Sequence, residues 1–262
     1  MNILFTGDMV GSPGRKIFAR VVGQMKQRGA VDFVVANAEN VAGGKGITKV
    51  IAAELLAAGA DVLTMGDHMW DQKEIVSFLD IEKRLIRPAN FAPACPGRGI
   101  VTVDTPKGRV TVINLVGRVF MPPMDCPFRA VDALLSKEPN MGKVILVDMH
   151  AEATSEKIAM GRHLDGRVSA VVGTHTHVQT SDETILPRQT AYLTDLGMTG
   201  AKDSIIGRDY ASVMGKFLTG MPSKFEIAEQ NIALEGALID VDETTGRARK
   251  ITRIREFLDK AK

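Results

Sequence analysis

Short apolar runs alternate with amphipathic stretches along the first 80 residues, and this alternation constrains the fold more than any other feature of the sequence. Strands are expected at Asn2–Thr6, Phe33–Ala36 and Val62–Met65, and helices at Arg15–Gln27 and Lys49–Ala58. Strands that alternate with helices are typical of parallel β-α-β units. The sequence therefore predicts an α/β fold.

A further helix is expected from Asp71 to Leu79, because Asp71 resembles an N-cap and Glu74 follows three residues later, as in a capping box. The rest of the chain predicts helices, strands and two hairpins. The helices are Phe128–Ser136, Glu152–Arg162 and Tyr210–Leu218, the single strands Val144–Asp148 and Ala170–Val172, and the hairpins Gly99–Val103 with Arg109–Leu115 and Ile232–Val241 with Ala248–Ile254. With no repeat or linker, one domain over residues 1–262 is expected, with two sheets or one mixed sheet covered by helices.

The composition argues against several classes of partner. The net charge is only +2, so no surface built for duplex nucleic acid is expected. No apolar run reaches the ~18 residues of a membrane span. Cys95 and Cys126 lie far apart in no C-x-x-C pattern, which favours a reducing environment and predicts a cytoplasmic location. A homo-oligomer is left open by the sequence.

Two histidines, His175 and His177, stand one residue apart directly after an apolar run. In an extended segment such residues point the same way, so both imidazoles can reach one point in space. Four other strand-like runs also end in ligand-type residues, and α/β sheets bind ligands at the carboxyl ends of their strands. These residues are Asp8, Glu39 with Asn40, Asp67 with His68, and His150.

Mixed carboxylate and imidazole ligands suit manganese, iron, zinc or nickel better than calcium or magnesium. The candidates exceed what one tetrahedral zinc needs, so we expect two metals about 3.5–4 Å apart that share one carboxylate. Such a pair is typical of phosphoryl chemistry. His68 lies beside a ligand and is a candidate for protonating the leaving oxygen.

Several motifs of the sequence resemble those of a known family. Gly7-Asp8, the Asp67-His68 pair after a glycine, and Gly173-Thr-His-Thr-His177 are similar to motifs of the calcineurin-like metallophosphoesterases. Two further segments, Asn37–Gly46 and Ala191–Gly200, resemble its YmdB-like branch. The resemblance implies a central β-sandwich of two mixed sheets flanked by helices in four layers. It also implies a small phosphoester substrate, with phosphodiesterase activity on 2′,3′-cyclic nucleotides.

The resemblance further implies a role for each candidate residue. Glu39 would bridge two transition-metal ions, with iron or manganese expected first and zinc as the alternative. The first ion would be held by Asp8, Glu39, Asn40 and His177, and the second by Glu39, Asp67, His150 and His175. A hydroxide shared by the metals would be the nucleophile and His68 the general acid.

One residue departs from the family pattern. Asp67 stands where asparagine is usual. Three carboxylates and a hydroxide would balance two divalent ions, whereas asparagine would leave one positive charge to attract the phosphate. We therefore expect Asp67 to tighten metal binding and to slow turnover, unless a trivalent iron restores the charge.

Two other functions are compatible with the sequence. Amidohydrolases also use a His-x-His pair, although theirs opens an eight-fold barrel, for which this chain has too few β-α units. A regulatory or scaffold protein with a structural or weakly active metal site is the second alternative. The glycine-rich segment Val41–Thr48 is no phosphate loop, because Lys45 is followed by glycine instead of Ser or Thr, so it is expected to form a rim of the site.

Overall fold

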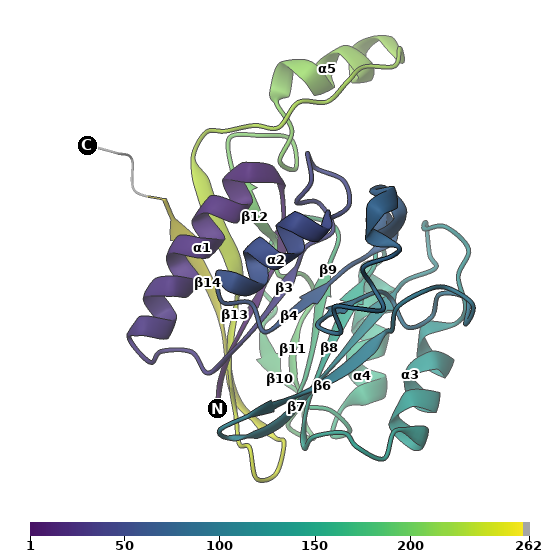
Figure 1. Ribbon diagram of the computed structural model, residues 1–262, viewed down its shortest axis with the longest axis vertical. Helices are drawn as coiled ribbons and strands as arrows, with labels where there is room; N and C mark the ends of the chain where they lie inside the picture. Colours follow the sequence, from purple (N-terminus) through teal and green to yellow (C-terminus); the bar gives the residue numbers. More distant parts are fainter. Residues whose placement is uncertain (259–262) are drawn as a thin grey trace.

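The computed structural model describes residues 1–258 and consists of two β-sheets packed face to face between layers of helices (Figure 1). Both sheets contain parallel and antiparallel pairs. The strands of the first sheet, in spatial order, are β2 (Asp8–Met9), β12 (Met198–Ala201), β13 (Ile232–Val241), β1 (Asn2–Thr6), β3 (Phe33–Asn37), β4 (Val62–Thr64) and β5 (Leu85–Ile86), with β14 (Ala248–Phe257) paired to β13. Those of the second are β10 (Thr184–Ile185), β11 (Ala191–Leu193), β9 (Ala170–Thr174), β8 (Val144–His150), β7 (Gly108–Val116) and β6 (Ile100–Thr105).

Helices cover the outer face of each sheet. The first sheet is covered by α1 (Gly11–Gln27) and α2 (Lys49–Ala57), and the second by α3 (Pro127–Lys137) and α4 (Thr154–Leu164). The remaining helix, α5 (Tyr210–Thr219), projects above this body (Figure 1). None of the helices within residues 1–258 combines the length and the apolar character of a membrane span.

The structure contains three apolar layers, so the central strands are buried on both faces. Such strands do not need to alternate apolar and polar residues, which explains why their sequences are continuous apolar runs. In β1, Leu4 packs toward α1, whereas Ile3 and Phe5 pack toward the second sheet. The layer between the sheets contains residues of both. This shared layer supports the prediction of one domain over residues 1–262, which stays a prediction. Residues 259–262 of that predicted domain lie outside the described part of the chain. The predicted four-layer α/β fold is confirmed.

The helix predicted from Asp71 to Leu79 is wrong. Short 3₁₀ turns at Asp67–Trp70 and Lys73–Ile75 take its place. The capping box does not form, because both acidic side chains bind elsewhere. The Asp71 carboxylate contacts His68 Nδ1 at 2.9 Å, and Glu74 accepts the backbone N–H of Lys49 at 3.1 Å.

The direction of the strands determines where the site lies. In the first sheet β1, β3 and β4 run parallel, and in the second β7, β8, β9 and β11 run parallel. Parallel strands end at one edge of their sheet, so the residues that follow them can gather there.

The other predicted helices and hairpins are present with boundaries shifted by a few residues, and five short strands (β2, β5, β10, β11 and β12) were not expected.

Candidate metal centre

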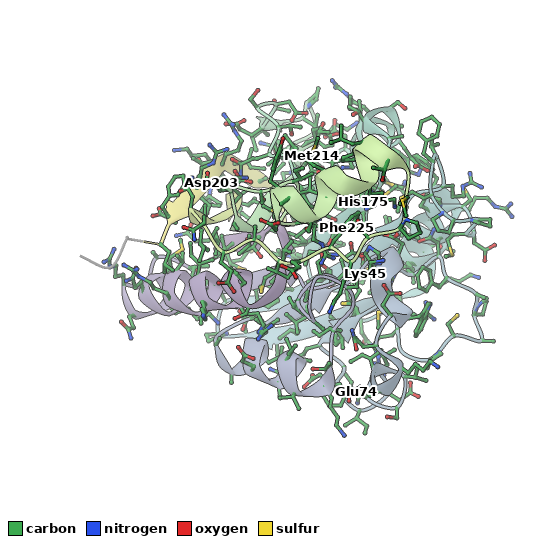
Figure 2. The ribbon with its side chains drawn as sticks, turned by 90° about the horizontal axis from the view of Figure 1, so that it is seen from above. Lys45, Glu74, His175, Asp203, Met214 and Phe225 are labelled. Atoms are coloured by element: carbon green, nitrogen blue, oxygen red, sulfur yellow. The ribbon has the colours of Figure 1, made fainter. Side chains whose placement is uncertain are left out.

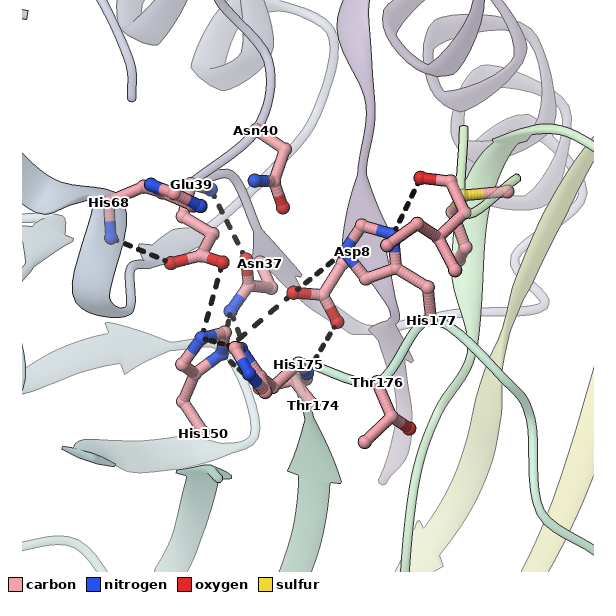
Figure 3. Close-up of polar contacts among 12 residues, drawn as sticks. Asp8, Asn37, Glu39, Asn40, His68, His150, Thr174, His175, Thr176 and His177 are labelled. Atoms are coloured by element: carbon pink, nitrogen blue, oxygen red, sulfur yellow. Dashed lines mark hydrogen bonds and ion pairs between the residues drawn. The ribbon is translucent and has the colours of Figure 1, made fainter. Parts of the chain in front are cut away.

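All eight predicted site residues come together at the carboxyl edges of the two sheets, and Figure 3 labels all of them except Asp67. The first sheet contributes its residues from β2, from the turn after β3 and from the 3₁₀ turn after β4. The second contributes the last residue of β8 and the turn after β9. In chain order they are Asp8, Glu39, Asn40, Asp67, His68, His150, His175 and His177.

Four of these residues form a group whose ligand atoms all lie within 4.8 Å of one another: Glu39, Asp67, His150 and His175. His150 Nε2 lies 3.2 Å from Glu39 Oε1 and 3.2 Å from Asp67 Oδ1. His175 Nδ1 lies 3.1 Å from His150 Nε2 and 3.6 Å from Asp67 Oδ1. Such a set of two carboxylates and two imidazoles can hold a transition-metal ion.

A second set of ligand atoms adjoins this group. Asp8 Oδ1 lies 3.9 Å from His177 Nε2 and 3.8 Å from His150 Nδ1, and Figure 3 shows Asn40 on the same side of Asp8 as Glu39. Asp8 Oδ1 and Asn40 Oδ1 are buried without a hydrogen-bond partner. An unpaired buried oxygen is costly, so two such oxygens at this site fit a cation.

The charges of the centre also fit cations. Within residues 1–258, the ion-pair partners of Asp8, Glu39 and Asp67 are all histidines, with no lysine or arginine among them. Burial raises the pKa of Asp8 well above its usual range, although the charge of His150 opposes this. Burial alone would lower the pKa of His150, but the carboxylates of Glu39 and Asp67 raise it well above its usual range. Two buried carboxylates and a half-buried one therefore attract positive charge to their centre.

The histidines after β9 present neutral rings to this centre. Burial lowers the pKa of His177 to about 4, and burial together with the charge of His150 lowers that of His175. At neutral pH both rings therefore have a lone pair available, which is the form that binds metal.

Hydrogen bonds behind His150 fix its ring. The Thr174 hydroxyl donates to Asp148 Oδ1 at 2.7 Å and lies 2.9 Å from His150 Nδ1. Because that hydroxyl already donates its proton, His150 Nδ1–H is the donor of the second contact, and Nε2 is directed at Glu39 and Asp67. Asp148 accepts further hydrogen bonds from Thr64 and Asn37.

A buried ion pair anchors the turn that holds His175 and His177. Asp195 Oδ2 accepts the hydroxyl of Thr176 at 2.7 Å and its backbone N–H at 3.2 Å, and lies 2.6 Å from Lys157 Nζ. His175 and His177 have positive φ angles of 102° and 64°. Non-glycine residues hold such angles only where neighbouring contacts fix them, and the bonds to Thr176 provide this between the two histidines.

His68 lies at the mouth of the centre. Its backbone N–H donates to Glu39 Oε2 at 3.3 Å, and its ring contacts Asp71 through Nδ1. With Glu39, Asn40, His175 and His177 it lines a cavity of about 340 Å³. The Asp71 contact orients the ring of His68 beside the space that a substrate would occupy.

This geometry accords with the comparisons with known proteins. Residues 4–254 match the family described as YmdB-like protein. The chain belongs to the YmdB-like family. The family predicted from the sequence motifs is thus confirmed.

Relatives of this YmdB-like protein include a named enzyme. The 2′,3′-cyclic-nucleotide 2′-phosphodiesterase of Bacillus subtilis is 49% identical over 97% of this chain and 96% of its own. Two crystal structures are similar: a hypothetical protein from Thermus thermophilus (39% identity, TM-score 0.92, 98% of this chain and 99% of that one) and a novel phosphatase from Mycoplasma pneumoniae (34% identity, TM-score 0.91, 98% and 93%). Two of these three proteins, the phosphodiesterase and the phosphatase, are named as phosphoester hydrolases, which is the class predicted from the sequence.

Several residues at the site of this YmdB-like protein were not predicted from the sequence. Glu152 Oε2 lies 3.1 Å from His175 Nε2 and lines the same cavity, yet it was expected only as the start of a helix. Asp195 and Lys157 were not singled out for any role. Glu152 follows His150 by two residues, a spacing that could have indicated it.

Proposed function

We propose that this protein is a dinuclear metal-dependent phosphodiesterase that hydrolyses 2′,3′-cyclic nucleotides. The observation that carries the proposal is the convergence of two buried carboxylates, one half-buried carboxylate, three imidazoles and an unpaired amide oxygen at one site beside a cavity. The named activity of the Bacillus subtilis relative, at 49% identity over nearly the whole chain, supports the substrate class.

Seven residues would hold the metals. Asp8, Asn40 and His177 would bind one ion, Asp67, His150 and His175 the other, and Glu39 would contact both. The group of four ligand atoms within 4.8 Å supports the second set, and the unpaired oxygens of Asp8 and Asn40 support the first. When bound, such a pair of cations neutralises charge on the phosphoryl oxygens and lowers the pKa of a water that can serve as nucleophile.

The remaining chemistry belongs to the protein itself. His68 would donate a proton to the ribose oxygen that leaves phosphorus, and Asp71 would keep its ring turned toward that oxygen. The hydrogen bonds that His150 donates to Thr174 and that Thr176 donates to Asp195 hold the imidazoles in place. The strands of residues 1–258 form two stacked sheets, an architecture that differs from the eight-stranded barrel of an amidohydrolase.

Iron or manganese is the expected metal, because mixed nitrogen and oxygen ligands suit these ions, with zinc as the alternative. The cytoplasm is the proposed location, and the free thiols of Cys95 and Cys126 suit a reducing compartment.

Hydrolysis of adenosine 2′,3′-cyclic phosphate tests the proposal. We expect turnover by metal-replete protein, loss of turnover after chelation, and recovery when iron or manganese is restored. The variant Glu39→Gln should be inactive under all three conditions, since it removes the shared carboxylate. Metal-replete protein that leaves the compound intact would refute the proposal and favour the scaffold alternative.

A further inference from the structure

A second cavity, of about 440 Å³, adjoins the cavity of the metal centre. Arg208 lines both cavities, while Gly44 lines the first and its neighbour Gly43 the second. Figure 2 looks down on this region and labels Lys45 and Phe225, which line the second cavity, together with His175 of the metal centre. The glycine-rich segment is thus a rim that the two cavities share.

Three cations and an aromatic ring line the second cavity, and no carboxylate does: Lys45, Arg208, Lys216 and Phe225. The Lys216 ammonium lies over the Phe225 ring, 5.4 Å from its centroid. Within residues 1–258, none of the three cations forms an ion pair with an aspartate or glutamate. A hollow lined by positive charge of this kind attracts an anion.

Arg208 is held rigidly at the junction of the two cavities. Its guanidinium donates to the carbonyl oxygens of Gly43 at 3.1 Å and Gly44 at 2.6 Å. Gly44 has a φ of +90°, and a Cβ there would lie 2.3 Å from the guanidinium carbon, so only glycine allows this contact. Carbonyl dipoles, not a carboxylate, thus orient this cation, and its full charge remains available to a ligand.

We propose that the second cavity binds the phosphate on the 5′ oxygen of the substrate together with the nucleotide that precedes it. The preferred substrate is then a short RNA that ends in a 2′,3′-cyclic phosphate. This inference rests on the proposed phosphodiesterase function. With the cyclic phosphate at the metal centre, the next phosphate of an RNA is attached to the same ribose, and Arg208 lies where the two cavities meet. Lys45 and Lys216 add charge, and the preceding base can stack on Phe225.

The reaction itself is unchanged by the longer substrate. Water adds to the phosphorus of the cyclic phosphate, the bond from phosphorus to one ribose oxygen breaks, and that oxygen takes a proton. The internucleotide linkage in the second cavity stays intact, because it lies away from the metal ligands.

Three compounds test the proposal on metal-replete enzyme: adenosine 2′,3′-cyclic phosphate, the same compound with a 5′-phosphate, and the adenosine dinucleotide that ends in the cyclic phosphate. We expect kcat/KM for the dinucleotide to exceed that of the first compound by about tenfold or more. Lys216→Ala should lower this ratio by about three- to fivefold, and Phe225→Ala by about tenfold. Lys137→Ala, which removes an exposed lysine at the end of α3, is the matched control and should leave the ratio unchanged.

The 5′-phosphorylated mononucleotide separates charge from stacking. Its advantage should depend more on Lys216 than on Phe225, because it has no preceding base and Phe225 acts on it only through its contact with Lys216. A binding measurement gives a readout besides turnover: the dinucleotide 3′-phosphate should bind more tightly than adenosine 3′-phosphate, with a steeper dependence on salt.

Equal kcat/KM for all three compounds, unaltered by Lys216→Ala and Phe225→Ala, would overturn the inference and leave the proposed function standing. Binding of the dinucleotide that depends on Lys216, without turnover of any compound, would retain the second cavity as a nucleotide site and contradict the phosphodiesterase.

Discussion

The contact between Thr176 and Asp195 should control metal affinity, and Thr176→Val tests this directly. The substitution keeps the shape of the side chain but removes the hydroxyl that donates to Asp195 Oδ2 at 2.7 Å. Asp195 is fully buried and is paired with Lys157, so the lost bond is one to a charged, desolvated acceptor. Bonds to charged groups contribute about 1.5–3 kcal/mol, and we expect the free energy of unfolding to fall by that amount.

The effect on the metal centre follows from backbone strain. The positive φ angles of His175 and His177 each cost on the order of 1–3 kcal/mol, so the turn relaxes once its anchor weakens. Loss of a partner that orients metal ligands lowers metal affinity by about 10–100-fold. Chemical denaturation of the metal-free variant measures the first effect, and competition with a chelator measures the second.

Thr176→Ser is the matched control, because it keeps the hydroxyl and should behave like the natural protein in both assays. Wild-type metal affinity in Thr176→Val, despite the lost stability, would refute the link between the anchor and the imidazoles. So would equal effects of the valine and serine substitutions.

Four further substitutions test other parts of the account. His68→Ala should lower kcat by about 10²–10⁴-fold with the metal content of purified protein unchanged, and loss of metal would contradict its role as general acid. Asp67→Asn should bind metal more weakly and turn over faster, as chelator competition and kcat will show; a slower, tighter-binding variant would refute the charge argument. Lys157→Met should lower the unfolding free energy by about 3–5 kcal/mol, because Asp195 then stays buried without its partner, and adding Asp195→Asn should recover part of this in urea titrations. Gly44→Ala should cost at least about 1 kcal/mol through its collision with Arg208, whereas Gly23→Ala, with open space around it inside α1, should stabilise the protein in the same melting experiment.

The convergence of the candidate ligand residues could be predicted because their signal is local. Asp8, Glu39, Asp67, His150 and His175 each follow an apolar run, and parallel strands bring such positions to one edge whatever the register between them. The same logic predicted the layers of the fold, since each long strand and most helices have a clear hydrophobic period.

The contacts that orient the ligands depend on pairings that the sequence does not reveal. Asp195 reaches Thr176 because the three-residue strand β11 pairs with β9, with Leu193 beside Val172. A strand that short has no periodicity, so neither its existence nor its partner could be inferred. Lys157 is a charged residue that is almost fully buried, against the usual preference of lysine for the surface.

The wrong helix at Asp71–Leu79 has a related cause. The capping-box pattern was present, but Asp71 contacts the ring of His68 and Glu74 bonds to the start of α2. Local helix signals were thus overridden by contacts that place His68 at the site. A departure from local propensity next to a functional side chain is where such a conflict is expected.

Elemental analysis of the purified protein tests the central claim most directly. We predict about two transition-metal ions per chain, falling to one or fewer in Asp8→Ala while the protein stays folded. A wild-type protein that retains no transition metal after purification and cannot be reloaded with iron, manganese or zinc would contradict the account.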